Sequence, residues 1–160
     1  MTYEPRRRTW ILAVLAFVTC GGSDATGPAG PEGGGESDVE QFVTGMNAHR
    51  LSEGCPALTW HAGVAAVAQD HSQDMVDREF FSHTNPDGEN PFERLANAGI
   101  TWDGGAGENI AAGTSDATLV LDLWLDSPGH RLNIENCAYT HHGVGLASEH
   151  WTHVFVTDPD

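Results

Sequence analysis

Three polar side chains in this sequence are framed by small or apolar neighbours that could leave them accessible at one site. His83 follows two phenylalanines and a serine, Glu108 lies in a Gly-Glu-Asn-Ile segment, and His130 follows Ser-Pro-Gly. Two neutral imidazoles and one carboxylate are a recurrent ligand set for zinc and similar divalent ions, with water in the remaining position. Without a metal, the same groups could transfer protons, because imidazole titrates near neutral pH. We therefore predict that the three side chains converge in one shallow site.

The remaining histidines have more ordinary interpretations. His71 lies on the inner face of an expected helix, where a buried, hydrogen-bonded ring is favoured over a ligand. His141 and His142 are adjacent in the sequence. Adjacent residues on a strand point to opposite faces, which disfavours joint metal binding by these two histidines. Six others fall at exposed helix positions, turns or strand ends and are expected at the surface: His49, His61, His141, His142, His150 and His153.

A nucleophilic enzyme is a further alternative. Ser82 and Ser127 are close in sequence to the two candidate histidines, but neither lies in a Gly-x-Ser-x-Gly motif. Serines beside glycine and proline are usually turn residues. This alternative therefore has less support than metal binding or proton transfer.

Residues 1–19 have the pattern of an export signal. Three arginines precede the apolar run 10–18, which is too short for a membrane-spanning helix of about 20 apolar residues. Cys20 follows directly, as in bacterial lipoproteins, so a lipid anchor at this cysteine is the favoured prediction. Plain secretion and an uncleaved signal anchor are the alternatives. We expect the protein outside the cytoplasm, either lipid-anchored to the cell envelope or secreted.

The other two cysteines, Cys55 and Cys137, form one even pair. In an exported protein such a pair favours a disulfide, and two buried free thiols are the alternative. A zinc site that uses both cysteines has less support, because neither lies in a close Cys-x-x-Cys or Cys-His cluster.

The charge of the chain excludes nucleic acid as a partner. The formal net charge is −16 at pH 7, with only seven basic residues, all of them arginines. Affinity for nucleic acid comes largely from basic side chains that neutralise phosphates. An anionic membrane surface would repel the chain as well, so membrane attachment is expected only through the N-terminal anchor. Solubility and self-repulsion are sufficient explanations of the acidity.

Composition divides the chain into three parts. After the signal, residues 20–38 form a glycine-rich flexible linker without large apolar side chains, which cannot bury enough surface to offset its ordering entropy. Residues 39–157 then make one domain of ordinary size.

Hydrophobic periodicity and turn signals predict four helices and three strands within this domain. Helices are expected at 39–52, at 61–79, after Asn90 as far as Gly99, and at 116–126, and strands at 108–111, 143–147 and 152–156. The last helix should end at Pro128 and Gly129, which would leave His130 at a corner. Helices mixed with a few, mostly late, strands indicate an α+β fold.

Several short motifs occur in an order that resembles the CAP superfamily (cysteine-rich secretory proteins, antigen 5 and pathogenesis-related 1; the SCP-like domain), in its compact bacterial branch. The resemblance covers residues 39–157 and implies a three-layer α-β-α sandwich with a central, mainly antiparallel sheet. It also implies structural, hydrogen-bonding roles for Asn47 and Arg50 in the first helix. The motifs are Asn47-Ala48-His49-Arg50, His71-Ser72-Gln73-Asp74-Met75, Phe81-Ser82-His83 with Pro86-Asp87-Gly88, Pro91-Phe92-Glu93-Arg94, Gly107-Glu108-Asn109-Ile110-Ala111, Trp124 with Ser127-Pro128-Gly129-His130-Arg131, and Gly143-Val144-Gly145.

The resemblance also assigns a cleft. His83, Glu108 and His130 match three of the four cleft residues that many animal and plant members share. The fourth, a second glutamate at the end of the preceding helix, is not matched, because Asp126 or Ser127 stands there. Asp126 has a shorter side chain. We therefore expect a metal site formed by His83 and His130, with Glu108 as a further candidate ligand and Asp126 at the cleft.

The family is linked to binding of sterols or other lipids, to divalent-metal binding and in some members to proteolysis. We therefore expect a monomeric cell-envelope binding module without an organic cofactor. Its cleft would hold zinc or another divalent metal and a small or extended lipid-like, cell-wall or protein ligand. A metal-dependent or His/Glu-dependent hydrolase, with Glu108 as its catalytic residue, is the second hypothesis. A structural or adhesive envelope protein with a vestigial cleft is the third.

Overall fold

The computed structural model describes residues 37–160. The predicted export signal, Cys20 and most of the linker lie outside the described residues. Within 37–160, no helix is both long and apolar enough to cross a membrane. The elements in chain order are α1 (Asp38–Ser52), β1 (Thr59–Trp60), α2 (Ala62–Asp77), α3 (Pro91–Asn97), β2 (Ala106–Ala112), α4 (Ala117–Asp126), α5 (Pro128–Ile134), β3 (His141–Ala147) and β4 (His150–Val156).

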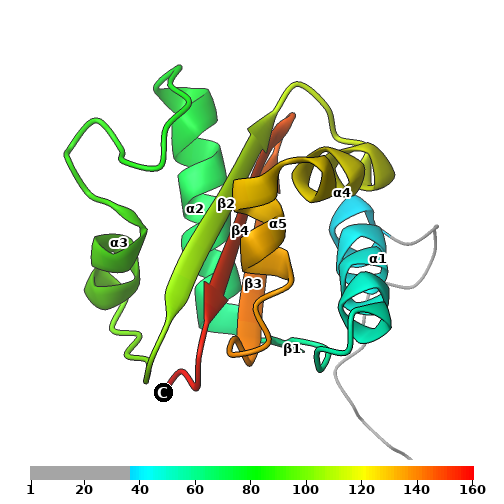
Figure 1. Ribbon diagram of the computed structural model, residues 1–160. Coiled ribbons are helices and arrows are strands. Elements are labelled where there is room, and N and C mark those ends of the chain that lie inside the picture. Colours follow the sequence, from blue (N-terminus) through cyan, green and yellow to red (C-terminus); the bar gives the residue numbers. More distant parts are fainter. Residues whose placement is uncertain (1–36) are drawn as a thin grey trace, which may run out of the picture. The chain divides into compact units, whose positions relative to one another are not determined.

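A four-stranded sheet forms the middle layer, in the order β1-β3-β4-β2. β1 pairs with β3 in parallel, and the other two pairings are antiparallel. Helices α2 and α3 lie on one side of the sheet, whereas α1, α4 and α5 lie on the other (Figure 1). This arrangement is the predicted α-β-α sandwich with a mainly antiparallel sheet.

The larger part of the core lies between the sheet and helices α1, α4 and α5. Phe42 of α1 meets Trp124 of α4 edge to face, with ring centroids 5.3 Å apart. The indole Nε1–H of Trp124 donates to the carbonyl of Ile110, so α4 is fastened to β2. Burial of each large aromatic side chain contributes about 1.5–3 kcal/mol, and here it also fixes the helix that precedes His130.

On the opposite face, α2 packs backbone to backbone against β3. A Cβ atom on Gly143 would lie 2.1 Å from the backbone nitrogen of Ala65, and one on Gly145 would lie 2.3 Å from that of Gln69. Only glycine permits this approach. The Gly-Val-Gly motif therefore fixes the height of α2 above the sheet, and with it the position of the loop that follows α2.

The region around Pro128 differs from the prediction. The sequence predicts that Pro128 and Gly129 end a helix and leave His130 at a corner. α4 does end at Asp126, but Pro128 occupies the first turn of a new helix, α5, and His130 lies within it. Proline suits this position because its φ angle is already helical and its missing N–H would have no partner there.

Two histidines expected at the surface are instead fully buried. His142 of β3 and His153 of β4 are both 0% exposed, and His142 Nδ1 lies 3.0 Å from His153 Nε2. For His142 the expectation was wrong because β3 begins two residues earlier than predicted. His153 lies within the predicted last strand, but its side chain points to the core face of the sheet. Side chains alternate between the faces of a sheet, so both rings point with Trp151 and Phe155 into the core beneath α1 and α4.

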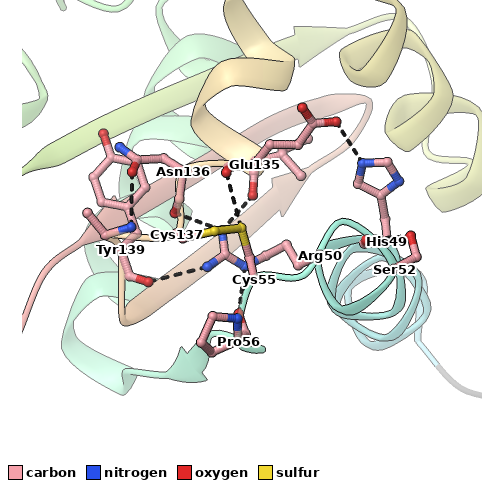
Figure 2. The surroundings of a disulfide bond; sticks show 11 residues. His49, Arg50, Ser52, Cys55, Pro56, Glu135, Asn136, Cys137 and Tyr139 are labelled. Atoms are coloured by element: carbon pink, nitrogen blue, oxygen red, sulfur yellow. Dashed lines mark hydrogen bonds and ion pairs between the residues drawn. A yellow bond between two sulfur atoms is a disulfide. The ribbon is translucent and has the colours of Figure 1, made fainter.

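A disulfide and a buried arginine join the end of α1 to the loop after α5 (Figure 2). Cys55 and Cys137 are bonded, as predicted. Arg50 is 0% exposed, and its guanidinium donates to the carbonyl oxygens of Pro56, Ile134, Asn136 and Tyr139. Nearby, the side chain of Asn47 bonds both backbone groups of Leu58. These contacts fix the C-terminal end of α5, the helix that carries His130.

Candidate functional site

His83 and Glu108 form the centre of the site. His83 lies in the loop between α2 and α3, Glu108 lies in β2, and His83 Nδ1 is 2.8 Å from Glu108 Oε1. The imidazole is 50% exposed, whereas the Glu108 side chain is 2% exposed. Because a carboxylate accepts the hydrogen bond, Nδ1 carries the proton and Nε2 of the neutral ring keeps a lone pair.

Arg94 holds the same carboxylate from α3. Its Nη2 donates to Glu108 Oε2 at 2.6 Å, and its Nη1 donates to the carbonyls of His83 at 2.8 Å and Glu89 at 3.0 Å. Both oxygens of Glu108 therefore have a partner, and its buried charge is balanced by a guanidinium. Asn90 caps the start of α3, which sets the position of Arg94 one turn into the helix.

His130 is held by groups from β2 and α4. Its carbonyl accepts a hydrogen bond from Asn109 Nδ2 at 3.0 Å, and Asn133 in turn donates to Asn109 Oδ1. Its ring packs near Trp124, with centroids 6.2 Å apart. Burial lowers the pKa of His130 and the neighbouring His83 lowers it further. The ring is therefore neutral at pH 7, and its buried Nδ1 has no hydrogen-bond partner among the described residues.

Other candidate residues are placed apart from this group. Asp126 is exposed at the end of α4, and no hydrogen bond or ion pair within residues 37–160 joins it to the two histidines or to Glu108. Ser82 Oγ accepts from the backbone of Thr84, and within the same part of the chain neither Ser82 nor Ser127 bonds an imidazole through its hydroxyl. Neither of the two candidate serines is therefore activated by a histidine of that part of the chain.

His71 supports the loop that carries His83. The ring is 1% exposed, and its Nε2 donates to the carbonyl of Ser82 at 3.0 Å. Burial, followed by the charge of Arg94, lowers the pKa of His71. A neutral ring on α2 thus fixes the backbone one residue before His83.

Known proteins match this chain over the region that contains the ordered motifs. Residues 43–157 match the family described as "CAP: Cysteine-rich secretory protein family". The chain belongs to this family. The CAP domain is 38% identical over 119 residues to the Bacillus subtilis "Uncharacterized protein YkwD", covering 73% of this chain and 46% of that protein. It is 34% identical over 117 residues to "Uncharacterized membrane protein YlbC" of the same organism, covering 73% of this chain and 34% of that one. The chain thus spans less than half the length of these curated relatives.

Solved structures agree with this assignment. An extracellular protein containing an SCP domain from Bacillus anthracis superimposes with a TM-score of 0.72 at 37% identity, over 75% of this chain and 40% of that chain. An outer surface protein of Borrelia burgdorferi gives a TM-score of 0.68 at 18% identity, over 76% and 92% of the two chains, which shows a shared fold. The resemblance inferred from the ordered motifs is therefore confirmed.

The metal-binding side chains available in the CAP domain limit the kind of metal site that it could form. Within residues 37–160, no group of three or more His, Cys, Asp or Glu side chains is arranged to hold a metal ion. Both carboxylate oxygens of Glu108 accept hydrogen bonds from His83 and Arg94. The side chains left to bind a metal are therefore the imidazoles of His83 and His130. A carboxylate that bonds the second nitrogen of a histidine is the usual support for a metal-binding ring. The residues present therefore fit a two-histidine site completed by water.

Three residues of the site are not evident from the sequence alone: Arg94, Asn109 and Asn133. A signal for Arg94 does exist. A glutamate in an apolar strand requires a cation when it is buried, and beyond the N-terminal signal the sequence offers only four arginines. The two asparagines carry no such signal, because their role depends on the approach of α5 to β2.

Proposed function

We propose that this CAP domain is an extracytoplasmic binding module in which His83 and His130 hold a divalent metal ion, with zinc as the leading candidate. The supporting observation is the bond from His83 Nδ1 to the buried carboxylate of Glu108. It fixes the tautomer and orientation of a half-exposed ring. Burial, followed by the charge of His83, lowers the pKa of His130, so a second imidazole is neutral and able to bind a metal.

The chain's own residues would do most of the positioning. Arg94 holds the Glu108 carboxylate, Glu108 holds the His83 ring, and Asn109 holds the backbone of His130. A bound metal would supply a Lewis-acidic contact for an oxygen or nitrogen atom of a small or extended ligand. Lipid-like and cell-wall molecules are the ligand classes that the resemblance suggests.

Binding is favoured over hydrolysis because Glu108 is poorly placed to act as a general base, with a side chain that is only 2% exposed. Both carboxylate oxygens already accept hydrogen bonds, one from His83 and one from Arg94. A general base needs an oxygen within reach of the proton that it removes. The hydrolase hypothesis therefore lacks an accessible base at Glu108, and in the described part of the chain neither Ser82 nor Ser127 bonds a histidine as an activated nucleophile would.

The cellular location forms part of the same proposal. The related structures come from proteins described as extracellular and as an outer surface protein. The N-terminal pattern supports export, with attachment to the membrane through a lipid at Cys20. The acidic surface would contribute nothing to that attachment, because it repels anionic lipids.

Isothermal titration of zinc into the purified chain tests the proposal. We expect His83→Ala and His130→Ala each to weaken zinc binding at least about 10-fold. Glu108→Gln should weaken it by a similar or smaller factor, since it removes the charge that supports His83. His141→Ala is a matched control, because this partly exposed ring lies outside the site. Equal zinc affinity in wild type and His83→Ala would reject the site.

A further inference from the structure

A cavity of about 470 Å³ is lined by residues of α2, of the segment that leads into α3 and of α3 itself. These elements lie on the side of the sheet opposite α1 (Figure 1). His83, Glu108 and His130 are not among its lining residues. The volume falls within the range of small-molecule sites, about 300–1,000 Å³. Its wall is largely polar and includes Asp70, His71 and Asp74 from α2 and Asp87, Glu89 and Arg94 from the facing segment.

His71 brings an unpartnered acceptor to this cavity. Its Nε2 is the donor to the Ser82 carbonyl, so Nδ1 of the neutral ring carries a lone pair. That nitrogen has no hydrogen-bond partner within residues 37–160, and the side chain is 1% exposed. A buried polar atom without a partner costs about 1–3 kcal/mol. A ligand that donates to His71 would remove this cost.

Arg94 brings an unpartnered donor to the same cavity. Its two terminal nitrogens are occupied by Glu108, His83 and Glu89. Its Nε has no partner in the described part of the chain, and the side chain is 8% exposed. Two residues that line the cavity therefore carry one acceptor and one donor without a partner, a pattern that hydroxyl groups satisfy because each can donate and accept.

The positive charges around the cavity are already committed. Arg78 bonds the carboxylates of Asp74 and Asp87, and Arg94 is paired with Glu108. Both guanidinium groups therefore have carboxylate partners before any ligand arrives. The other carboxylates that line the cavity therefore have no arginine of the lining left to balance their charge.

Two carboxylates of the lining lack a cationic partner. Asp70 makes no hydrogen bond or ion pair within residues 37–160, and Glu89 is held only by the neutral amides of Asn85 at 2.8 Å and Asn97 at 2.7 Å. A partly enclosed surface with excess negative charge attracts cations. A bare metal ion is not favoured, because these residues contain no three-ligand group. An ammonium group, with three N–H donors, fits carboxylates spread along a wall.

We propose that this cavity binds a small hydroxylated primary amine of the amino-sugar type. Its ammonium group would lie near Asp70 and Glu89, and its hydroxyl groups would bond His71 Nδ1 and Arg94 Nε. The cavity shares Arg94 with the two-histidine site but contains neither of the proposed metal-binding histidines, and its occupancy does not require a metal.

Titration of the isotopically labelled full chain with D-glucosamine, followed by amide NMR shifts at constant ionic strength, tests the proposal. We expect saturable shifts in residues 70–78 and 85–98 at millimolar concentration, about 1–20 mM. Glucose has the hydroxyls without the charge, and cyclohexylamine has the charge without the hydroxyls. Each should bind at least about 5-fold more weakly. Absence of saturable shifts with glucosamine, or equal affinity for either analogue, would overturn the proposal.

Asp70→Asn supplies the matched variant, because Asp70 is exposed and its replacement should leave the fold intact. We expect it to weaken glucosamine binding at least about 5-fold, whereas Asp122→Asn, on the exposed face of α4, should leave it unchanged. An equal effect of both substitutions would show attraction by net charge alone and would reject the site. Zinc affinity should be the same in Asp70→Asn as in wild type, so failure of either site can be distinguished from failure of the other.

Discussion

His83 donates a hydrogen bond through Nδ1 to the carboxylate of Glu108, joining a half-exposed ring to a nearly inaccessible charge. Arg94 completes the chain of contacts on the other carboxylate oxygen. A loop, a strand and a helix are thus linked through one carboxylate. The free nitrogen of His83 is oriented before any ligand arrives, which is what a preorganised binding site requires.

Arg94→Ala should destabilise the domain. It leaves the buried charge of Glu108 without a cation and removes the bonds to two backbone carbonyls, so we expect a loss of about 3–5 kcal/mol in the free energy of unfolding. Urea denaturation followed by tryptophan fluorescence measures this. The double variant Arg94→Ala/Glu108→Gln should recover part of the loss, because the uncompensated charge is gone. A loss below about 1 kcal/mol for the single variant would show that Glu108 is not effectively buried.

Arg50→Met should be similarly costly for a different reason. Its guanidinium serves four backbone carbonyls and no carboxylate, and each carbonyl left unpaired costs about 1–3 kcal/mol. We expect a total loss above about 3 kcal/mol by the same measurement. Arg131→Met is the control, since Arg131 is exposed on α5 and should change stability by less than about 0.5 kcal/mol. Equal effects of the two substitutions would contradict a structural role for Arg50.

Gly143→Ala tests the close approach of α2 to the sheet. A Cβ atom there would overlap backbone atoms of α2, which cannot move aside as a flexible side chain can. Overpacking usually costs about 1–3 kcal/mol, and we expect the upper end of this range or failure to fold. Gly129→Ala is the control, because a Cβ atom at Gly129 meets nothing within 4 Å. A thermal midpoint for Gly143→Ala equal to that of the control would refute the contact.

The buried pair of histidines predicts acid sensitivity. Burial, followed by the charges of Arg50 and His141, lowers the pKa of His142 from 6.5 to about 4, and burial lowers the pKa of His153 as well. At pH values between about 4 and 6.5, the unfolded chain binds protons at these histidines that the folded chain does not. The free energy of unfolding therefore falls as pH falls from about 6.5 to about 4. His142 alone should account for about 3 kcal/mol over this window.

Urea midpoints at several pH values check this prediction. Because carboxylates also titrate near pH 4, the comparison is with His142→Leu/His153→Phe, which should show a flatter profile. NMR of the imidazole C–H groups provides a second measurement, in which both rings should remain neutral down to about pH 5. Titration of either ring near pH 6.5 would contradict the burial of the pair.

Local signals were sufficient for four of the five helices within residues 37–160, whereas α5 was missed because Pro128 was expected to end a helix. Predicted and observed ends of the first and fourth helices differ by one residue at the N-terminus, and Asp116 proves to be the cap of α4, whose side chain accepts from Thr118 and Leu119. His61 likewise caps α2 instead of beginning it. Capping residues and apolar spacing are properties of short segments, so they can be recognised without knowledge of the packing.

Features that depend on contacts between distant segments could not be predicted in this way. β1 has only two residues and exists because Thr59 and Trp60 pair with β3. The burial of His142 follows from two extra residues at the start of β3, and that of His153 from the packing of α1 and α4 over its face of the sheet. The contact of Arg94 with Glu108 joins elements that sequence spacing does not relate. For the site, the small or apolar neighbours of His83, Glu108 and His130 named the candidates, and the ordered family motifs strengthened the reason to group them.

Crystals of the zinc-loaded chain, with diffraction data collected on both sides of the zinc absorption edge, provide the most direct test of the two-histidine site. We predict one anomalous peak about 2.0–2.1 Å from a ring nitrogen of both His83 and His130, with Glu108 still bonded to His83 Nδ1. A peak coordinated by other side chains, or no peak beside these two rings, would contradict it.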